Sequence, residues 1–177
     1  MHVTMDQTRF ERGFTPQDYA SNIRNYRSLV KELVGEADAS EEHVAALKEI
    51  VSGWEQPVRA TMMTEDWCGD SATNMAVFAS FFEKAGVPFR IFRGSEMTDL
   101  KDGYESEGAD HIPVVSLWDG TGRERLRWIE APAAVAEKKA AWEGEHPEFQ
   151  ELYQKQKKGD KQAMKEFGSL YRTLLEA

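Results

Sequence analysis

The feature that most constrains this chain is the order in which an apolar run, a cysteine and a helical pattern follow one another. Residues 58–63 have the apolar character of a buried strand, and residues 71–85 have the pattern of a helix. Cys68 lies in the turn between them. A thiol at such a junction lies at the positive end of a helix dipole, which favours the thiolate.

Composition narrows the class of protein. Cys68 is the only cysteine in 177 residues, so an internal disulfide is excluded and we expect a reducing, cytoplasmic setting. The net charge of −9 argues against a broad surface for nucleic acid or acidic membranes. No apolar stretch is long enough to span a bilayer, and the N-terminal residues lack the layout of a secretory signal. We therefore expect one globular domain that binds neither nucleic acid nor membrane.

The segment before the cysteine predicts two helices. Residues 1–14 carry little pattern, and we expect them to lie as a loose arm. Thr15 has the residue type of an N-cap, and an apolar stripe continues from it to Gly35, which predicts one long helix. Ser40 is the expected N-cap of the second helix.

The segment after the cysteine predicts alternating strands and helices. The expected elements are a strand at 89–93, a short interrupted helix at 97–106, strands at 113–118 and 123–129, and a helix at 131–142. The Asp-Gly-Thr-Gly turn between the last two strands is typical of a hairpin. Two further helices, one on each side of Gly159, complete the chain.

Two separated motifs resemble the active site of the thioredoxin superfamily. The first is the Trp-Cys-Gly-Asp-Ser turn at 67–71. The second is His111-Ile112-Pro113 at the start of the next-to-last strand, where the family has an X-Pro bond in the cis form that faces the thiol. The resemblance implies an α/β protein with a thioredoxin-like fold, made of a βαβ unit, a β-hairpin and a helix.

In this interpretation the whole chain, residues 1–177, is a single thioredoxin-like domain with extra helices at both termini. Residues 57–143 would form the thioredoxin-like core. Residues 1–56 would be an N-terminal helical extension, and residues 144–177 a C-terminal helical pair. The apolar stripes of these added helices predict core packing, with a homodimer as the alternative.

Three departures from the family pattern bear on the chemistry. Asp70 replaces the usual proline and brings a carboxylate beside the sulfur. Ser71 stands where a second cysteine would be, so Cys68 can form a mixed disulfide but cannot release it by internal attack. Met62, six residues before the cysteine, stands where the family keeps a buried acid that assists proton transfer. Ordinary dithiol–disulfide reduction is therefore the activity that the sequence disfavours most directly.

Opposing effects act on the pKa of Cys68. Glu65, Asp66 and Asp70 all lie near the sulfur in sequence, and their charges disfavour a neighbouring anion. The helix dipole and the first-turn amides favour the thiolate, and a hydrogen bond from Ser71 Oγ to the sulfur would help. The sequence does not decide whether these effects together raise or lower the pKa of Cys68.

The resemblance also assigns roles around the thiol. Cys68 and Ser71 are the expected catalytic residues. The residues expected to frame a bound substrate are Trp67, Gly69, Asp70, Ile112 and Pro113. His111 is a candidate partner of the thiol or, with Asp70, a metal ligand; we favour a surface histidine and expect no metal.

These features support a leading hypothesis and two alternatives. The leading one is a monothiol thiol–disulfide oxidoreductase whose Cys68 exchanges with protein or small-molecule disulfides. It needs no bound cofactor, and a low-molecular-weight thiol serves as co-substrate. The first alternative is a non-catalytic binding module that holds clients through a long-lived mixed disulfide at Cys68 or by peptide pairing alone. A glutathione-transferase-like enzyme is disfavoured because the C-terminal part is short.

Overall fold

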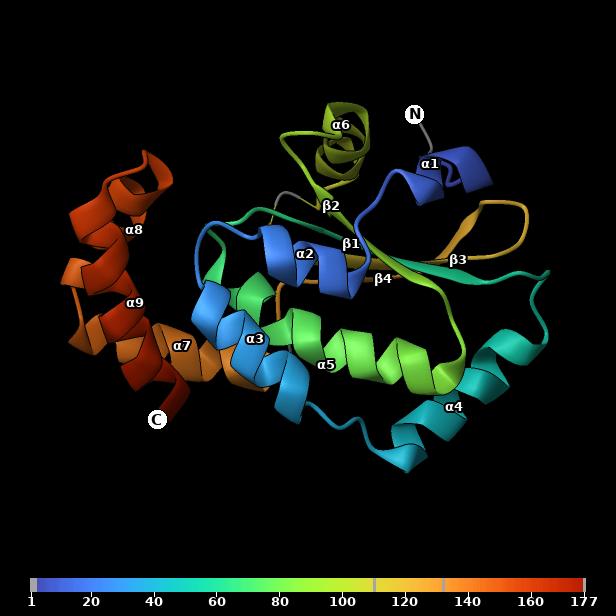
Figure 1. Ribbon diagram of the computed structural model, residues 1–177, viewed down its shortest axis with the longest axis horizontal. Helices are drawn as coiled ribbons and strands as arrows, with labels where there is room; N and C mark the ends of the chain where they lie inside the picture. Colours follow the sequence, from blue (N-terminus) through green and yellow to red (C-terminus); the bar gives the residue numbers. More distant parts are fainter. Residues whose placement is uncertain (1–2, 110, 132, 177) are drawn as a thin grey trace. The chain divides into compact units, whose positions relative to one another are not determined.

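The computed structural model describes residues 3–109, 111–131 and 133–176. The chain forms two compact units, Met1–Glu130 and Ala131–Ala177 (Figure 1). The first unit contains the sheet and both predicted motifs, and the second unit is helical.

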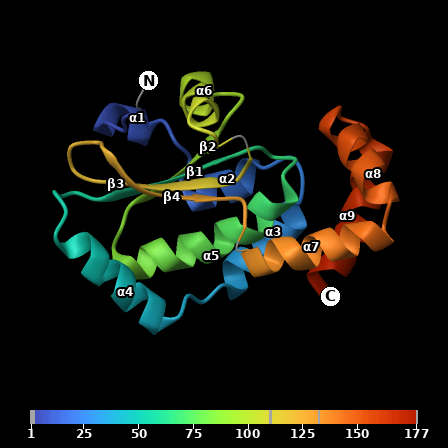
Figure 2. The same ribbon diagram turned by 180° about the vertical axis from the view of Figure 1, so that it is seen from behind.

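The first unit is built on a four-stranded sheet with the strand order β2-β1-β3-β4. The strands are β1 (Arg59–Thr64), β2 (Phe89–Arg93), β3 (Val114–Trp118) and β4 (Glu124–Ile129). β1 pairs in parallel with β2 and antiparallel with β3, and β3 pairs antiparallel with β4. The long helix α5 (Gly69–Ala85) joins the parallel pair and completes the predicted βαβ unit (Figure 2). The expected α/β, thioredoxin-like order of strands is confirmed.

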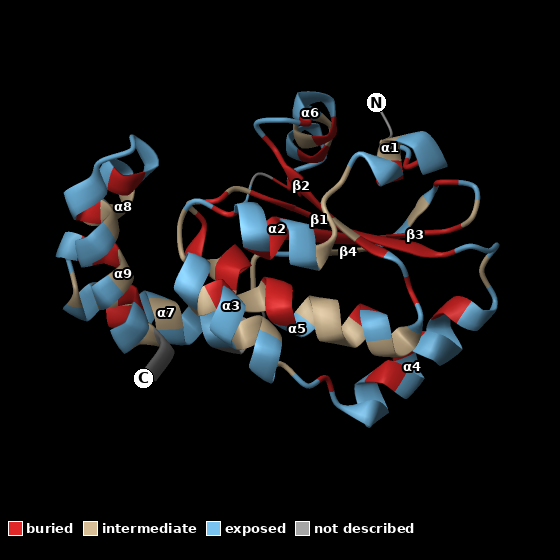
Figure 3. Ribbon diagram, viewed as in Figure 1, coloured by how far each residue is buried: buried red, intermediate tan, exposed pale blue. Residues whose placement is uncertain are grey.

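Helices cover both faces of this sheet. The helices on the first face are α2 (Pro16–Asn22), α3 (Arg27–Glu36), α4 (Glu41–Ser52) and α5, and those on the second face are α1 (Gln7–Glu11) and α6 (Thr98–Ser106). Met62 packs into the first face and Met63 into the second, because successive side chains of a strand point to opposite sides. The central strands are therefore buried throughout (Figure 3), which explains why they are apolar runs rather than alternating patterns.

The N-terminal segment differs from the prediction. The sequence predicts a loose arm over residues 1–14, but part of this segment forms α1, and Phe10 on that helix is buried. Phe14 pairs with Ile91 on the open edge of β2, where each backbone amide donates to the other's carbonyl at 2.9 Å. Contacts with the sheet order this segment, and no local sequence pattern reveals them.

The helix predicted from Thr15 to Gly35 is in fact two helices. Thr15 is the N-cap of α2, as predicted. The chain then breaks, and Tyr26 adopts a left-handed φ of 56° before α3 begins. The break allows the Arg24 amide to donate to the Asp66 carboxylate at 3.2 Å.

The interrupted helix predicted at 97–106 is also different, because α6 is continuous. Gly103, which suggested the interruption, lies under the side chain of Val3, and a Cβ there would come within 2.2 Å of that valine. The glycine therefore serves close packing between the N-terminal segment and α6, and it does not end the helix.

The second unit consists of α7 (Ala133–Glu145), α8 (Glu148–Lys157) and α9 (Lys161–Glu176). Its buried aromatic side chains are Trp142, Phe149, Phe167 and Tyr171. The ring centroids of Phe149 on α8 and Phe167 on α9 are 4.9 Å apart. The apolar stripes of these two helices thus pack against each other inside this unit.

We expect Gly13→Ala to destabilise the first unit, because a Cβ at this position would lie 2.7 Å from the side chains of Arg90 and Phe92. Overpacking of this kind lowers the free energy of unfolding by about 1–3 kcal/mol. Gly35→Ala is the matched control: nothing lies within 4 Å of its Cβ position on α3, and alanine should raise helix stability by up to about 1 kcal/mol. Urea unfolding, followed by tryptophan fluorescence, measures the free energy of unfolding of both variants. Equal effects would show that the N-terminal segment does not pack against β2.

Candidate functional site

Cys68 is the N-cap residue of α5 and is only 5% exposed. Its thiol donates a hydrogen bond to the backbone carbonyl of Ile112, with an S···O distance of 3.6 Å. The Ile112–Pro113 peptide bond is cis, as the resemblance implied. The structure therefore brings together the two predicted motifs, which are 44 residues apart in the sequence.

The other predicted site residues surround this contact. Gly69 is buried as the first residue of α5, and Trp67 and Asp70 are half-buried on either side of the thiol in sequence. The backbone carbonyl of Asp70 accepts hydrogen bonds from Thr73 Oγ1 at 3.0 Å and from Asn74 Nδ2 at 2.8 Å. These side chains strengthen the first turn of the helix that carries the cysteine.

Ser71 does not make the bond that the sequence predicts. Its side chain is buried, with the residue only 2% exposed. Within the part of the chain that the structure describes, Ser71 Oγ has no hydrogen-bond partner, and the predicted bond to the sulfur is absent. The thiol proton is donated to Ile112 instead, and the Ser71 hydroxyl remains unused in the interior.

We expected Glu65, Asp66 and Asp70 all to act on the sulfur. In the structure, Glu65 and Asp66 are bonded to other groups. The buried Asp66 carboxylate accepts a hydrogen bond from Arg93 Nε at 2.8 Å and forms a buried ion pair with it. Glu65 accepts hydrogen bonds from the amide and hydroxyl of Ser95. Because an ion pair has little net charge, Asp66 opposes a thiolate much less than an isolated carboxylate would.

Arg93 is the buried residue near the cysteine turn that the sequence did not single out. Its Nη2 donates to the backbone carbonyl of Asn22 at 3.3 Å, and its guanidinium lies 4.7 Å from the ring centroid of Phe14. Burial alone would lower the pKa of Arg93, but hydrogen bonds from it to Asp66 and Glu96 outweigh that effect and raise the pKa. Arg93 therefore stays charged and connects the cysteine turn to β2, α2 and the N-terminal segment.

The Tyr19 hydroxyl is another buried group beside this ion pair. It has no hydrogen-bond partner of standard geometry within the described residues. Burial, together with the nearby charge of Asp66, raises the pKa of Tyr19 far above its ordinary value. The phenol therefore stays protonated at any physiological pH.

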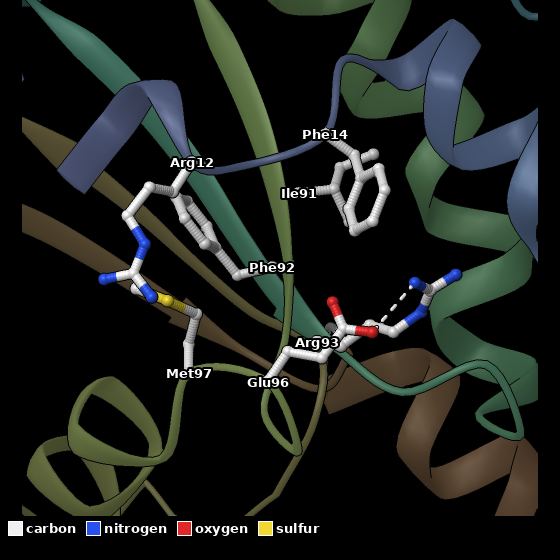
Figure 4. Close-up of a pocket in the computed structure, with 7 residues that line it drawn as sticks. All are labelled: Arg12, Phe14, Ile91, Phe92, Arg93, Glu96 and Met97. Carbon is white, nitrogen blue, oxygen red and sulfur yellow. Dashed lines mark hydrogen bonds and ion pairs between the residues drawn. The ribbon is translucent and has the colours of Figure 1, made fainter. Parts of the chain in front are cut away.

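A cavity of about 110 Å³ lies next to Arg93 (Figure 4). It is lined by Arg12, Phe14, Ile91, Phe92, Arg93, Glu96 and Met97. The ion pair between Arg93 and Glu96 borders it, at 3.1 Å. No residue of the cysteine turn lines this cavity, so it is separate from the site around Cys68.

His111 is placed at the surface. Its side chain is 66% exposed, and Nδ1 lies 3.9 Å from Glu130 Oε2. Among the described residues, no group of three or more histidine, cysteine, aspartate or glutamate side chains is arranged to hold a metal ion. In the described part of the chain, no helix combines the length and apolar character needed to cross a membrane.

A family model described as thioredoxin matches residues 13–143, a span that includes β1, the cysteine turn, α5 and the cis-proline strand. The chain belongs to the thioredoxin family. The match also includes the helices α2, α3 and α4, which precede the sheet in the chain.

One solved structure agrees with this fold over nearly the whole chain. A protein of unknown function from Pseudomonas aeruginosa, PA1234, is 17% identical with a TM-score of 0.56, and the match covers 97% of this chain and 98% of that one. A thioredoxin from Fasciola hepatica is 14% identical with a TM-score of 0.34, over 54% of this chain and 88% of that one. A comparison with curated proteins gives no match.

We expect Asp66→Ala to lower the free energy of unfolding by about 3–5 kcal/mol, because it leaves the buried charge of Arg93 without its main partner. The control is Glu105→Ala, which removes an exposed ion pair with Lys101 and should cost less than about 1 kcal/mol. Urea unfolding of both variants makes the comparison. A similar small loss in both would contradict the structural role given to the Asp66–Arg93 pair.

Two buried serines provide a second prediction. Ser116 Oγ bonds to Tyr104 Oη at 2.8 Å and to the Glu124 carboxylate, whereas Ser71 Oγ has no partner among the described residues. Ser116→Ala should therefore lower the free energy of unfolding by about 1–3 kcal/mol. Ser71→Ala should leave it unchanged or raise it by up to about 1 kcal/mol, since it removes an unsatisfied hydroxyl and alanine favours the helix. Thermal unfolding measures both, and a large loss for Ser71→Ala would show that its hydroxyl is bonded in solution.

Proposed function

We propose that this thioredoxin-family protein carries out thiol–disulfide exchange through a mixed disulfide at Cys68. The observation that supports the proposal most is the position of the sulfur, at the start of a 17-residue helix and 3.6 Å from the Ile112 carbonyl. The helix supplies first-turn amides that favour a thiolate. The backbone at Ile112 supplies a polar group beside the sulfur that a bound substrate can use.

The reaction requires two thiolates in turn. The Cys68 thiolate attacks one sulfur of a disulfide; a new S–S bond forms, the old one breaks, and the second sulfur leaves as a thiolate. Ser71 stands at the position from which a resolving cysteine would act. An external low-molecular-weight thiolate therefore attacks the mixed disulfide, releases Cys68 and carries the substrate group away as a new disulfide.

Ionisation of Cys68 also prepares the backbone for substrate. In the thiol form the Ile112 carbonyl accepts the proton of Cys68. When this proton leaves, the carbonyl becomes free to accept an N–H from an extended substrate segment, in the manner of strand pairing. Trp67, half-buried next to the cysteine, would provide an apolar surface for that segment.

The low exposure of the thiol limits which disulfides can react. A sulfur on a residue only 5% exposed is accessible to a small disulfide or to a flexible segment, and less so to a disulfide held in a rigid surface. We therefore propose small disulfides and flexible protein segments as substrates. The single cysteine fits a reducing compartment, such as the cytoplasm, where external thiols are abundant.

The alternative is a binding module without chemistry, which the same burial of Cys68 and the apolar Met62 six residues before it favour. In this function the protein would hold a partner segment along the backbone at Ile112. The thiol would then serve only to pack the start of α5.

Reaction with oxidised glutathione distinguishes the two functions. We expect the folded protein to gain one glutathione per chain at Cys68, as detected by intact-protein mass spectrometry, and Cys68→Ser to gain none. Added reduced glutathione should release the adduct, whereas dilution alone should not, because no second thiol lies in the chain. An adduct that forms only after unfolding in urea would contradict exchange and favour the binding module.

A further inference from the structure

We propose that the cavity beside Arg93 is a binding site for a short-chain carboxylate, whose charged group lies on Arg12 and whose apolar chain fills the cavity. The proposal goes beyond the proposed function. It uses no chemistry of Cys68, and no residue of the cysteine turn lines the cavity.

The walls of this cavity are held in place by backbone hydrogen bonds. On one side Phe14 and Ile91 exchange two bonds of 2.9 Å. On the other side the amides of Glu96 and Met97 both donate to the carbonyl of Arg93 at 3.0 Å. The cavity is therefore formed without a ligand, and binding requires little further ordering of the chain.

The interior is apolar and small. Ile91, Phe92 and Met97 are each at most 5% exposed, and Phe14, which completes the apolar lining, is half-buried. The volume of about 110 Å³ is less than that of an engineered apolar cavity of about 150 Å³ that binds benzene. An aliphatic chain of about three to five carbons is the group that fits such a space.

The charges at the two sides of the cavity are not equivalent (Figure 4). On one side Arg93 pairs with Glu96 at 3.1 Å and with Asp66 at 2.8 Å, so these charges are matched. On the other side lies the exposed Arg12, which has no ion pair and no side-chain hydrogen bond among the residues that the structure describes. A guanidinium is always charged and binds a carboxylate through two parallel N–H···O bonds. Arg12 is therefore the group that would hold the anion.

Arg90 adds a second positive charge nearby. Its Cβ lies 2.7 Å from the position that a Cβ on Gly13 would take, and Gly13 is the residue between Arg12 and Phe14. The Arg90 guanidinium donates to a backbone carbonyl at 3.1 Å and has no acidic partner within the described part of the chain. Two guanidinium groups without a carboxylate thus lie on this segment of a chain whose net charge is −9.

The acidic side chains of the neighbouring helices do not cancel this charge. Glu11 on α1 accepts a hydrogen bond from Gln7 at 2.6 Å. Asp99 on α6 pairs with Arg9. Since these carboxylates are bonded elsewhere, the potential at the mouth of the cavity favours an anion over a cation or a neutral molecule.

The test is a titration of the isotopically labelled full chain with isovalerate at neutral pH, followed by amide NMR. We expect saturable shifts of the amides of Phe14, Ile91 and Met97, with a Kd of about 1 mM or tighter. Isovaleramide has the same shape without the charge, and acetate has the charge without the chain; each should bind at least about fivefold more weakly. Equal binding of the amide or of acetate, or no saturable shift at tens of millimolar isovalerate, would overturn the proposal.

A matched pair of arginine variants locates the anion. Arg12→Gln should raise the Kd for isovalerate about five- to tenfold, because a charge-assisted contact at an exposed position is lost. Arg172→Gln is the control: this arginine is also exposed but lies on α9 in the second unit, and the Kd should stay at the wild-type value. Equal Kd values for Arg12→Gln and wild type would overturn the assignment of the anion to Arg12.

Cys68→Ser separates this proposal from the proposed function. The variant keeps every residue that lines the cavity, so it should bind isovalerate with the wild-type Kd. Failure of the glutathione reaction would therefore leave the carboxylate site intact. Loss of isovalerate binding in Cys68→Ser would contradict a site that is separate from the thiol.

Discussion

The buried ion pair between Asp66 and Arg93 is the interaction on which the geometry of the site depends. Arg93 is the last residue of β2 and lies opposite Thr64, the last residue of β1. Asp66 follows two residues later, so the pair holds the turn at the end of the sheet immediately before Cys68. A buried pair is stabilising only when further hydrogen bonds satisfy its groups, and here Arg24 and Asn22 provide them.

This pair also determines which charges act on the thiol. Asp66 would otherwise place a carboxylate two residues from the sulfur, but its charge is matched by Arg93. Glu65 is bonded to Ser95 and so is held by the next loop. Next to Cys68 lie the start of α5, which favours a negative atom at this position, and the Ile112 carbonyl, which accepts the thiol proton. The Asp66–Arg93 ion pair thus reduces the negative charge that acts on the thiol.

The sequence was sufficient for elements whose signal is local. The strand patterns of β1 and β2, the Asp-Gly turn before β4 and the N-cap at Thr15 each lie in a short stretch of consecutive residues. The contact of Cys68 with Ile112 was predictable as well, because two motifs of the thioredoxin family specify it. In each case the residues that form the structural feature also carry the sequence pattern that predicts it.

The remaining features depend on contacts between distant segments. Arg93 ends an apolar strand, where a charged residue usually marks the surface, and only the fold places Asp66 beside it. Phe14 has no local partner, yet it pairs with Ile91 and orders the N-terminal segment. The missing bond from Ser71 to the sulfur depends on the detailed side-chain geometry, which residue types do not specify.

We infer that the fold activates Cys68 despite burying it. The most direct measurement is the second-order rate constant of Cys68 with iodoacetamide at pH 7, for the folded protein and for the chain unfolded in urea; no other thiol contributes. We predict a rate constant for the folded protein at least as large as that of the unfolded chain, because the start of α5 compensates for restricted access. If the protein reacts only in proportion to its unfolded fraction, the fold does not activate Cys68, and the residue serves only for packing.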